Sequence, residues 1–414
     1  MSDLQPVRGT HDILPEEHRR HRFVGDTASA IAALYGYEEI STPIFEATDV
    51  FSRTLGETSD VVTKEMYSFE DKGGGSVTLR PEYTAGVARA FISGGLAQNL
   101  PLKFFCRGPM FRYERPQKGR QRQFHQIDVE LLGVADPLGD IEIIALGAHI
   151  LEALGVLDKV TLQLNTLGDS ASREAYRGML VDYLEGFRDK LSEDSRARLE
   201  RNPLRVLDSK DEGDRAIIAD APKLTDHLNE ASKTFFDDVK KGLTSAGISY
   251  EINPALVRGL DYYCHTAFEF VTDTLGAQGT VLAGGRYDGL IEAMGGPSTP
   301  GIGWAAGVER LSMMIAEPPP ASRPVTIIPV GDETKDLALA IAQQLRHAGF
   351  TIDLGFSGNL KKRLNRANKA NAIAAVIIGE DELAKGVAMV KDMEMGEQTE
   401  VQLSELEDHL AQYR

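Results

Sequence analysis

Cysteine is nearly absent from this sequence. Its only two cysteines, Cys106 and Cys264, are too few for a disulfide framework or a zinc site, and they suit a reducing compartment. No run approaches the ~18 uninterrupted apolar residues of a membrane helix. The opening residues MSDLQPVRGTHD also lack the basic-then-apolar pattern of a secretion signal. We therefore expect a cytoplasmic protein that does not associate with membranes.

Positive charge is also scarce, because 45 Lys and Arg residues face 62 Asp and Glu residues. The formal net charge of −17 disfavours sequence-blind adhesion to DNA or to anionic membranes. RNA is not excluded, since binding depends on local positive charge where the phosphates lie. The sequence has no P-loop, no clean dinucleotide-binding motif, no nucleophile elbow and no kinase signature. Nine scattered histidines suggest no catalytic triad, and we expect His11 and His125 to be packed or hydrogen-bonded.

A length of 414 residues exceeds one compact core and predicts two or three domains. Residues 170–247 are highly charged and helical in pattern, and we interpret them as a helical domain inserted into a main domain of residues 1–320. The stiff segment EPPPASRP, residues 317–324, marks a boundary. Beyond it, residues 325–414 alternate strand and helix, which predicts a small α/β domain with a largely parallel sheet.

Within the main domain, LKFFCRGPMFRYE and RQFHQIDVELLG predict an antiparallel hairpin. In the second segment Phe124, Gln126, Asp128 and Glu130 alternate with more apolar neighbours, so one face of the strand is polar. Gln126 and Glu130 would lie about 13 Å apart at ~3.3 Å per residue, a span that suits the two ends of a small polar ligand. A half-solvated sheet would give the same alternation, and that alternative stays open.

The loop of this hairpin concentrates positive charge in an otherwise acidic chain. Arginine grips phosphate oxygens with two parallel hydrogen bonds, so the loop is a candidate nucleotide-phosphate site, although a solvated charged hairpin explains it equally well. Glu114 is the one acidic residue among its basic residues, which are Arg112, Arg115, Lys118, Arg120 and Arg122.

Two later segments add candidate ligand contacts. In LVRGLDYYCHTAFEF, Arg258 precedes a glycine that permits close approach of a ligand, and the hydroxyls of Tyr262 and Tyr263 are suited to an imidazole or a ribose. A buried tyrosine-rich strand is the alternative for either tyrosine alone. The segments AGGRYDGL and GIGWAAGVERL are glycine-rich, and Arg310 is placed to reach a phosphate or to stack on a purine.

Taken in order, several segments strongly resemble the histidyl-tRNA synthetases, from about Pro6 to the C-terminus. They are PVRGTHDILP, TLRPEYTAG, FRYERPQKGRQRQFHQIDVELLG, LVRGLDYY, GGRYDGL and GVERL. STPIFE is similar to the class II motif 1 that builds the dimer, the basic hairpin to motif 2, and GIGWAAGVERL to motif 3. RGLDYY is similar to the histidine-specific signature of this family.

The resemblance implies a class II fold of mixed α/β and α+β character. Residues 1–320 would form a catalytic domain with an antiparallel sheet and flanking helices. Residues 170–247 would be the helical insertion that contacts the tRNA acceptor arm, and residues 325–414 the anticodon-binding α/β domain. The implied partners are L-histidine, ATP with Mg²⁺, tRNA-His and a second copy of the chain in a homodimer.

The resemblance also assigns roles to single residues. Glu82, Thr84 and Gln126 would hold the α-ammonium group of histidine. Glu130 and Tyr263 would hydrogen-bond its ring, and Tyr262 and Tyr287 would line the site.

The phosphate contacts implied by the resemblance fall to arginines. Arg112 would grip the α-phosphate, Arg120 the γ-phosphate and Arg310 the far end of ATP, with Glu114 beside them. Arg258 would contact both the histidine carboxylate and the α-phosphate, where sister enzymes use a metal, and no metal ion is expected to be fixed by side chains alone. Arg258 and Arg112 are therefore the predicted catalytic residues.

For tRNA, the hairpin loop and one C-terminal helix are the candidates. On the helix predicted over Asn359–Asn371, Lys362, Arg366 and Lys369 lie opposite an apolar face, although a generic solvated face has the same pattern. The loop candidates are Arg115, Lys118, Gln121 and Arg122.

Two positions depart from the family pattern. Tyr83 replaces the usual glycine of RPEGTAG, which bears on the shape of the pocket, and Gln121 replaces an aromatic residue in the motif 2 loop. The principal alternative function is that of a synthetase-like regulatory subunit of ATP phosphoribosyltransferase, which senses histidine without catalysis. Such subunits tend to lose RGLDYY and the motif 2 arginines, both of which this chain keeps.

Overall fold

The computed structural model describes residues 4–54, 61–256, 262–276 and 279–413. The chain forms two compact units, Met1–Pro318 and Pro319–Arg414. No helix in the described part of the chain has the length and apolar character needed to cross a bilayer.

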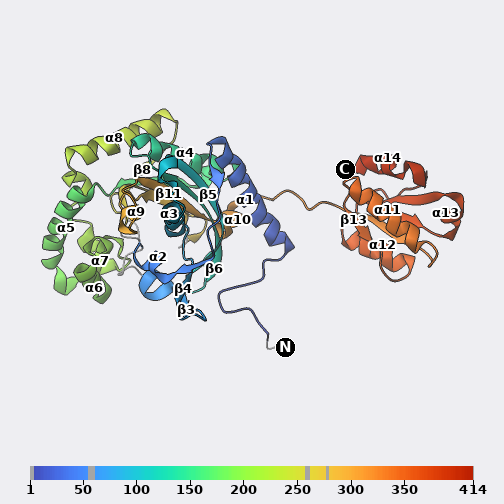
Figure 1. The fold of residues 1–414 in the computed structure, drawn as a ribbon, viewed down its shortest axis with the longest axis horizontal. Helices are drawn as coiled ribbons and strands as arrows, with labels where there is room; N and C mark the ends of the chain where they lie inside the picture. The colour runs from blue at the N-terminus through green and yellow to red at the C-terminus, as the bar shows by residue number, and fades with distance from the viewer. Residues whose placement is uncertain (1–3, 55–60, 257–261, 277–278, 414) are drawn as a thin grey trace. The chain divides into compact units, whose positions relative to one another are not determined.

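The first unit is built on an eight-stranded sheet in the order β1-β5-β6-β11-β10-β9-β7-β8 (Figure 1). At the two edges of the sheet, β1 pairs with β5 and β8 pairs with β7, both in parallel. All the pairs between them are antiparallel. The strands are β1 (Glu38–Glu39), β5 (Leu102–Phe111), β6 (Gln123–Leu132), β7 (Thr161–Thr166), β8 (Glu251–Ile252), β9 (Cys264–Val271), β10 (Thr280–Arg286) and β11 (Gly301–Gly307). The predicted hairpin is present as β5 and β6, paired from Leu102 with Leu132 to Phe111 with Gln123.

Four helices cover one face of this sheet and share its main core. They are α1 (Pro15–Leu34), α4 (Pro137–Ala153), α8 (Glu230–Ser245) and α10 (Val308–Met314). The other face packs against α3 (Thr84–Ser93) and α9 (Leu290–Ala293) through a smaller cluster that includes Tyr83, Phe91 and Met110. Because α3 begins directly over the middle strands, its first turn faces the polar side of β6.

A small sheet in the order β2-β4-β3 lies beside α3, with β2 (Phe45–Ala47), β4 (Ser76–Leu79), β3 (Tyr67–Glu70) and α2 (Thr48–Ser52). Pro43 precedes β2, which is an edge strand of this sheet. Shorter helical turns cover Val61–Glu65, Leu96–Asn99, Leu157–Lys159, Arg188–Lys190, Pro203–Asp208, Leu224–His227, Leu403–Glu405 and Ala411–Tyr413.

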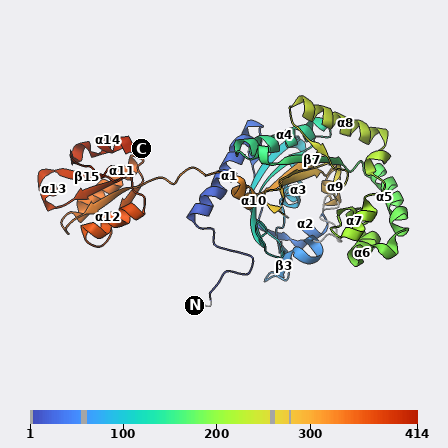
Figure 2. The same cartoon turned by 180° about the vertical axis from the view of Figure 1, so that it is seen from behind.

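The charged segment 170–247 is helical, as its pattern predicts, but its helices serve two cores. Helices α5 (Ser170–Glu185), α6 (Glu193–Arg201) and α7 (Glu212–Ile218) gather around Tyr176 and Leu180 (Figure 2). Helix α8 instead sends Phe236, Val239 and Leu243 into the main core, where it packs against α4. The separate helical cluster is therefore built before α8.

The second unit is a five-stranded sheet in the order β13-β12-β14-β15-β16. Its strands are β12 (Val325–Pro329), β13 (Ile352–Leu354), β14 (Ala374–Ile378), β15 (Val387–Asp392) and β16 (Gln398–Gln402). Its helices are α11 (Lys335–His347), α12 (Leu360–Lys369), α13 (Glu380–Lys385) and α14 (Leu406–Leu410). The sheet is mixed rather than largely parallel, because β15 and β16 pair antiparallel after the parallel β13, β12 and β14. A short helix joins β14 to β15, so the chain returns without the longer crossover that a parallel strand needs.

Candidate active site

A cavity of about 380 Å³ opens on the polar face of the large sheet. The first turn of α3, the middle strands β6, β9, β10 and β11, and the loop of the β5–β6 hairpin all contribute to its walls. It brings together eleven of the residues predicted from the sequence, which are Glu82, Thr84, Arg112, Glu114, Arg120, Gln121, Gln126, Tyr262, Tyr263, Tyr287 and Arg310. Residues separated by more than 200 positions in the chain therefore share one pocket.

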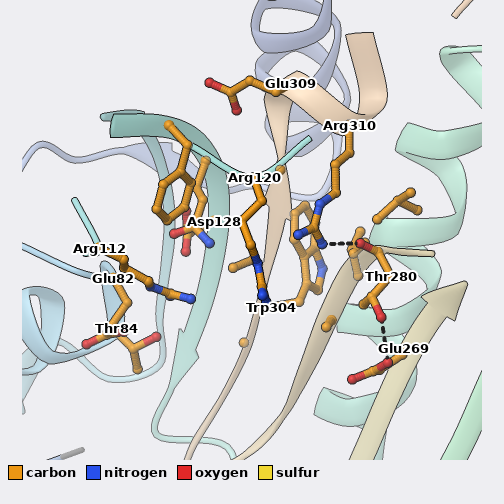
Figure 3. A pocket seen from close by; sticks show the side chains of 18 of the residues that line it. Glu82, Thr84, Arg112, Arg120, Asp128, Glu269, Thr280, Trp304, Glu309 and Arg310 are labelled. Carbon is orange, nitrogen blue, oxygen red and sulfur yellow. Dashed lines mark hydrogen bonds between the residues drawn. The ribbon is translucent and has the colours of Figure 1, made fainter. Parts of the chain in front are cut away.

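One end of the cavity is lined by carboxyl, amide and hydroxyl groups, and we call it the polar end. It is formed by Glu82 and Thr84 at the start of α3 and by Gln126 and Asp128 on β6 (Figure 3). Glu82 accepts a hydrogen bond from the Ala85 backbone amide at 2.8 Å, which fixes its carboxylate at the helix N-terminus. Burial raises the pKa of Glu82 above its usual range, although this amide and the positive charge of Arg112 oppose the shift.

Glu130 lies behind the wall of the polar end, where it is 1% exposed. Its carboxylate accepts a hydrogen bond from the Thr84 hydroxyl at 2.5 Å and another from the Tyr287 hydroxyl. Burial raises its pKa to about 8, against the effect of both hydroxyls. Glu130 therefore touches Thr84 and Tyr287, the two pocket residues that its oxygens orient.

Two acceptor atoms at the polar end have no hydrogen-bond partner among the described residues. They are Oε1 of Gln126 and Oδ2 of Asp128, and both are buried. Burial raises the pKa of Asp128 well above its usual range, and the charges of Glu130 and Glu82 add to this effect. Buried acceptors of this kind mark a place that a ligand's hydrogen-bond donor would fill.

The opposite end of the cavity is lined by Arg120 and Arg310, and we call it the arginine end (Figure 3). The Arg310 guanidinium donates to the carbonyls of Gly119 at 3.1 Å and Thr280 at 2.6 Å, while Arg120 forms an ion pair with Glu114. Burial and the neighbouring positive charge of Arg120 lower the pKa of Arg310. Two crowded guanidinium groups are the arrangement that an anionic ligand stabilises.

Arg112 projects into the cavity from the same side as Glu82 and Thr84 (Figure 3). Its Nε donates to the Pro81 carbonyl at 2.9 Å, and its guanidinium lies 5.3 Å from the centre of the Phe124 ring. One backbone bond and one aromatic contact hold the side chain and leave its outer nitrogens toward the cavity. Of the three described arginines that line the cavity, Arg112 is thus the one on the side of Glu82 and Thr84.

Two glycines of the segment GIGWAAGVERL lie against side chains of the site. A Cβ on Gly301 would meet the ring of Tyr287, and one on Gly303 would meet the Glu130 carboxylate. These two glycines therefore make room for buried side chains of the site.

Tyr83, which departs from the family pattern, lies behind the pocket wall. It is 1% exposed, packs against Cys106 and Met110, and donates its hydroxyl to the Arg107 carbonyl at 2.6 Å. The guanidinium of Arg80 lies 4.2 Å from its ring centre. The tyrosine thus fills the core under the polar end and leaves the neighbouring side chains of Glu82 and Thr84 in the cavity.

Three predicted residues of the hairpin loop lie away from the cavity. Arg115 and Lys118 are exposed. Arg122 donates to the carbonyls of Glu114 at 3.2 Å and Arg8 at 3.3 Å, and its guanidinium covers the Tyr113 ring at 3.7 Å. Arg122 therefore ties the loop to the N-terminal segment. Arg258, the other predicted catalytic residue, lies outside the described residues.

Among the residues that line the cavity, Trp304, Thr280 and Glu269 were given no role by sequence reasoning. Trp304 is on β11, and Thr280 donates its hydroxyl to Glu269 at 2.9 Å across β10 and β9. Glu269 is the one carboxylate in the strand CHTAFEFV, and such an isolated acid in an apolar strand is the signal that would have found it.

Only one group of described side chains has the make-up of a metal site, and it lies beside the cavity. His21, His125 and Glu309 place their candidate ligand atoms within 4.8 Å of one another. Glu309 already accepts hydrogen bonds from the His125 backbone amide and Nδ1 at 2.9 Å, in keeping with the expected hydrogen-bonded His125. This pairing holds β6 against α10, next to Gln126 and Arg310.

Comparison with known proteins agrees with this geometry. Residues 9–311 match a family model described as histidyl-tRNA synthetase, and residues 324–413 match one described as an anticodon binding domain. The protein named histidine–tRNA ligase in Rhodospirillum rubrum is 64% identical over the whole of both chains, and that of Gluconobacter oxydans is 55% identical over 98% of each. The crystal structure of the apo histidyl-tRNA synthetase of S. aureus superposes with a TM-score of 0.82 at 37% identity, covering 98% of this chain and 99% of that one. The chain therefore belongs to the histidyl-tRNA synthetase family.

Proposed function

We propose that this protein activates L-histidine with ATP and transfers the histidyl group to the 3′ end of tRNA-His. The observation that carries the proposal is the division of one cavity into a polar end and an arginine end. A small amino acid with a cationic group fits the first, and a nucleotide triphosphate fits the second. The two substrates of an adenylation reaction would thus meet inside one pocket.

At the polar end, Glu82, Thr84 and Gln126 would hold the α-ammonium group. Glu130 and Tyr263 would hydrogen-bond the imidazole ring, and Tyr262 and Tyr287 would line the site around it. The hydroxyls of Tyr287 and Thr84 already donate hydrogen bonds to Glu130, so Glu130 fixes the orientation of two side chains that would contact the ligand. A pocket that satisfies both ring nitrogens leaves buried polar groups unpaired when another side chain enters, a penalty of ~10⁴–10⁵ in favourable cases.

At the arginine end, Arg120 and Arg310 would bind the outer phosphates and Arg112 the α-phosphate. Arg112 lies beside the polar end, and this is where the α-phosphorus would have to meet the histidine carboxylate. Arg258 would join that carboxylate to the α-phosphate, and this assignment rests on the family signature RGLDYY. The ion pair of Arg120 with Glu114 would open when ATP binds, freeing both side chains.

Magnesium would accompany ATP, and the carboxylates suited to it are Glu114 and Glu269. Both line the cavity, and hard oxygen ligands of this kind are the ones Mg²⁺ prefers. Oε2 of Glu114 is buried, and its partner among the described residues is the Arg120 guanidinium, with which it forms an ion pair. When bound, the ion would neutralise phosphate charge.

The first step needs no general base, because a carboxylate is already a nucleophile at neutral pH. Its oxygen attacks the α-phosphorus as the bond to pyrophosphate breaks, so the protein's task is in-line placement and charge neutralisation. In the second step the 3′-hydroxyl of the tRNA attacks the activated carbonyl, and AMP leaves with the bonding electrons. A phosphate oxygen of AMP is the proton acceptor we propose for that hydroxyl.

The tRNA acceptor end would enter through a second, larger cleft of about 1080 Å³. Arg112, Glu114 and Arg120 line both spaces, so the cleft leads to the reacting phosphate. Its outer wall carries Arg205, Lys210, Arg215 and Lys223 from the helical segment. The exposed Arg115 and Lys118 of the hairpin loop, with Gln121 in the cavity wall, would meet the same end of the tRNA. Arg122 would act on the tRNA only indirectly, by holding the loop.

The second unit would bind the anticodon region. Lys362, Arg366 and Lys369 are exposed on α12, while Leu364 and Ala367 on its other face pack inward. The Arg366 guanidinium lies 5.7 Å from the ring of Phe356, which is 70% exposed. An exposed aromatic ring beside cations is suited to stacking on an unpaired RNA base.

We also propose that the protein acts in the cytoplasm as a homodimer. The segment STPIFE resembles the dimer-forming motif 1, and it ends in the edge strand β2. Ile44 and Phe45 are 44% and 58% exposed there, and burial of such apolar side chains is typical of a permanent interface. Sedimentation at micromolar concentration should give the mass of two chains; a single-chain mass would contradict this part of the proposal.

The activity is tested by histidine-dependent exchange of labelled pyrophosphate into ATP. We expect exchange with histidine and none with the other natural amino acids. A folded protein that binds histidine without exchange would instead support the regulatory-subunit function.

The tRNA role is tested separately in a variant with Lys362, Arg366 and Lys369 all changed to alanine. It should raise the KM for tRNA-His about 10-fold and leave pyrophosphate exchange unchanged, because α12 belongs to the other unit. A loss of exchange in this variant would contradict the assignment.

A further inference from the structure

Asp128 and Glu309 are the two described carboxylates of the cavity lining that the proposed reaction has not used, and Glu309 already accepts hydrogen bonds from His125. Asp128 lies on β6 between Gln126 and Glu130, and the strand's alternation turns all three toward the same face. Its side chain lines the cavity and is 1% exposed. Oδ2 has no hydrogen-bond partner among the described residues, and the same holds for Oε1 of the neighbouring Gln126.

Among the described residues, none forms an ion pair or hydrogen bond with Oδ2 of Asp128. Glu130 and Glu82 raise its pKa more strongly than Arg80 and Arg112 lower it. Arg80 is committed to backbone oxygens, since Nε donates to Pro109 at 3.0 Å and one terminal nitrogen donates to Thr42 at 2.8 Å. The carboxyl groups of Glu82, Asp128 and Glu130 thus lie together. The two described arginines do not offset the effect of Glu82 and Glu130 on the pKa of Asp128.

We propose that Asp128 binds the α-ammonium group of the substrate directly, as a further ligand beside Glu82, Thr84 and Gln126. This inference rests on the proposed function, whose residues include Glu82 and Gln126 but leave Asp128 without a role. An ammonium has three N–H donors and a full positive charge, so it would satisfy both unpartnered acceptors and favour the ionised form of Asp128 against the burial that raises its pKa. The imidazole ring would not do so, because it is mainly neutral at pH 7.5.

The test replaces Asp128 with asparagine, which keeps the shape and one acceptor oxygen but removes the charge. The KM for histidine in pyrophosphate exchange should rise about 10- to 100-fold, the range for loss of a charged hydrogen bond. The KM for ATP should change less than about twofold, because Asp128 lies at the polar end. An unchanged KM for histidine in Asp128→Asn would overturn the proposal.

A ligand that lacks only the amino group isolates the contact. In competition, 3-(imidazol-4-yl)propanoate should bind wild type and Asp128→Asn equally well, whereas histidine and histidinol, which keep the ammonium, should bind the variant more weakly. The preference for histidine over the propanoate would then shrink by the same 10- to 100-fold. Equal weakening of all three ligands would mean that Asp128 only shapes the pocket, and would also overturn the proposal.

Two controls separate this contact from other failures. Glu269→Gln removes a carboxylate from the arginine end of the same cavity, and it should raise the KM for ATP while preserving the preference for histidine over the propanoate. Asp128→Asn should be at least as resistant to urea as wild type, because removal of a repelled charge does not destabilise the fold; marked destabilisation would indicate a structural role. Histidine binding measured by calorimetry keeps the test valid if wild type shows no exchange, an outcome that would defeat the proposed function alone.

Discussion

The polar end and the arginine end of the cavity differ in how their side chains are held. At the polar end, Glu82 and Glu130 are buried and fixed by an α3 amide and by two hydroxyls, before any ligand is present. At the arginine end, Arg120 pairs with Glu114 and Arg310 binds two backbone carbonyls, contacts that an incoming phosphate would have to replace or share.

This difference separates selection from catalysis. Rigid, desolvated groups discriminate strongly, because a wrong ligand leaves them unpaired. The guanidinium groups of the arginine end give up their present partners to bind phosphate, and they then stabilise the charge that develops on it. We therefore expect changes at the polar end to alter the KM for histidine and the pH dependence of stability. Changes at the arginine end should alter turnover.

The largest effect is expected where the two ends meet, at Arg112. Arg112→Ala should lower the rate of pyrophosphate exchange ~10²–10³-fold at saturating substrates, because it removes a preorganised charge from the reacting phosphate. Arg112→Lys should recover only part of that rate, since lysine lacks the two-pronged geometry. An alanine variant that changes only KM would place Arg112 in binding and not in the chemical step.

A smaller effect is expected from Arg310. Arg310→Gln should raise the KM for ATP about 10-fold while the KM for histidine stays constant, because the side chain lies at the far end from Glu82. Steady-state exchange with each substrate varied in turn gives both constants. If the KM for histidine rises in parallel, the two ends are coupled and the comparison drawn above fails.

Glu130 provides a test of the polar end without substrate. Its pKa is about 8 in the folded protein, above the usual 4.5, so the folded state holds a proton that the unfolded chain releases. Its contribution to stability is therefore complete below about pH 4.5 and is lost as the pH rises to about 8. Urea denaturation at pH 5.5, 7.0 and 8.5 should show the free energy of unfolding falling less steeply in Glu130→Gln than in wild type. Equal slopes would mean that Glu130 stays ionised.

Asp214 is a useful contrast to Glu130. Hydrogen bonds from three serines and a backbone amide outweigh its burial and lower its pKa to about 2. Its contribution is present above the usual 3.8 and is lost only as the pH falls toward 2. Asp214→Asn should therefore lower stability by a similar amount at all three pH values.

The smallest effect is expected from Tyr83→Phe. Removal of the hydroxyl leaves the Arg107 carbonyl without this donor and should cost ~1 kcal/mol in the free energy of unfolding. The KM for histidine should not change, because the ring lies behind the wall of the polar end. An altered KM would show that Tyr83 shapes the pocket, as its place in the motif first suggested.

The sequence by itself determined a large part of this molecule. Alternation along residues 123–132 and the cluster of arginines before it predicted a polar strand next to a basic loop, because strand periodicity and charge are local properties. The order of the motifs identified the family, and the proline-rich segment at 317–324 predicted the break before the second unit. Two local patterns misled: the alternation after residue 325 hid the antiparallel β15 and β16, and α8 looked like part of a separate helical domain although it packs in the main core.

Only the tertiary structure decided which polar groups meet and which are left without partners. It placed Glu130 behind Thr84 and Tyr287, turned Arg122 away toward the N-terminal segment, and buried Tyr83 in the core. It also brought Glu269 and Thr280 into the cavity and left Oδ2 of Asp128 without a hydrogen-bond partner among the described residues. Hydrogen-bond partners and desolvation depend on contacts between distant segments, and no pattern within a single strand records them.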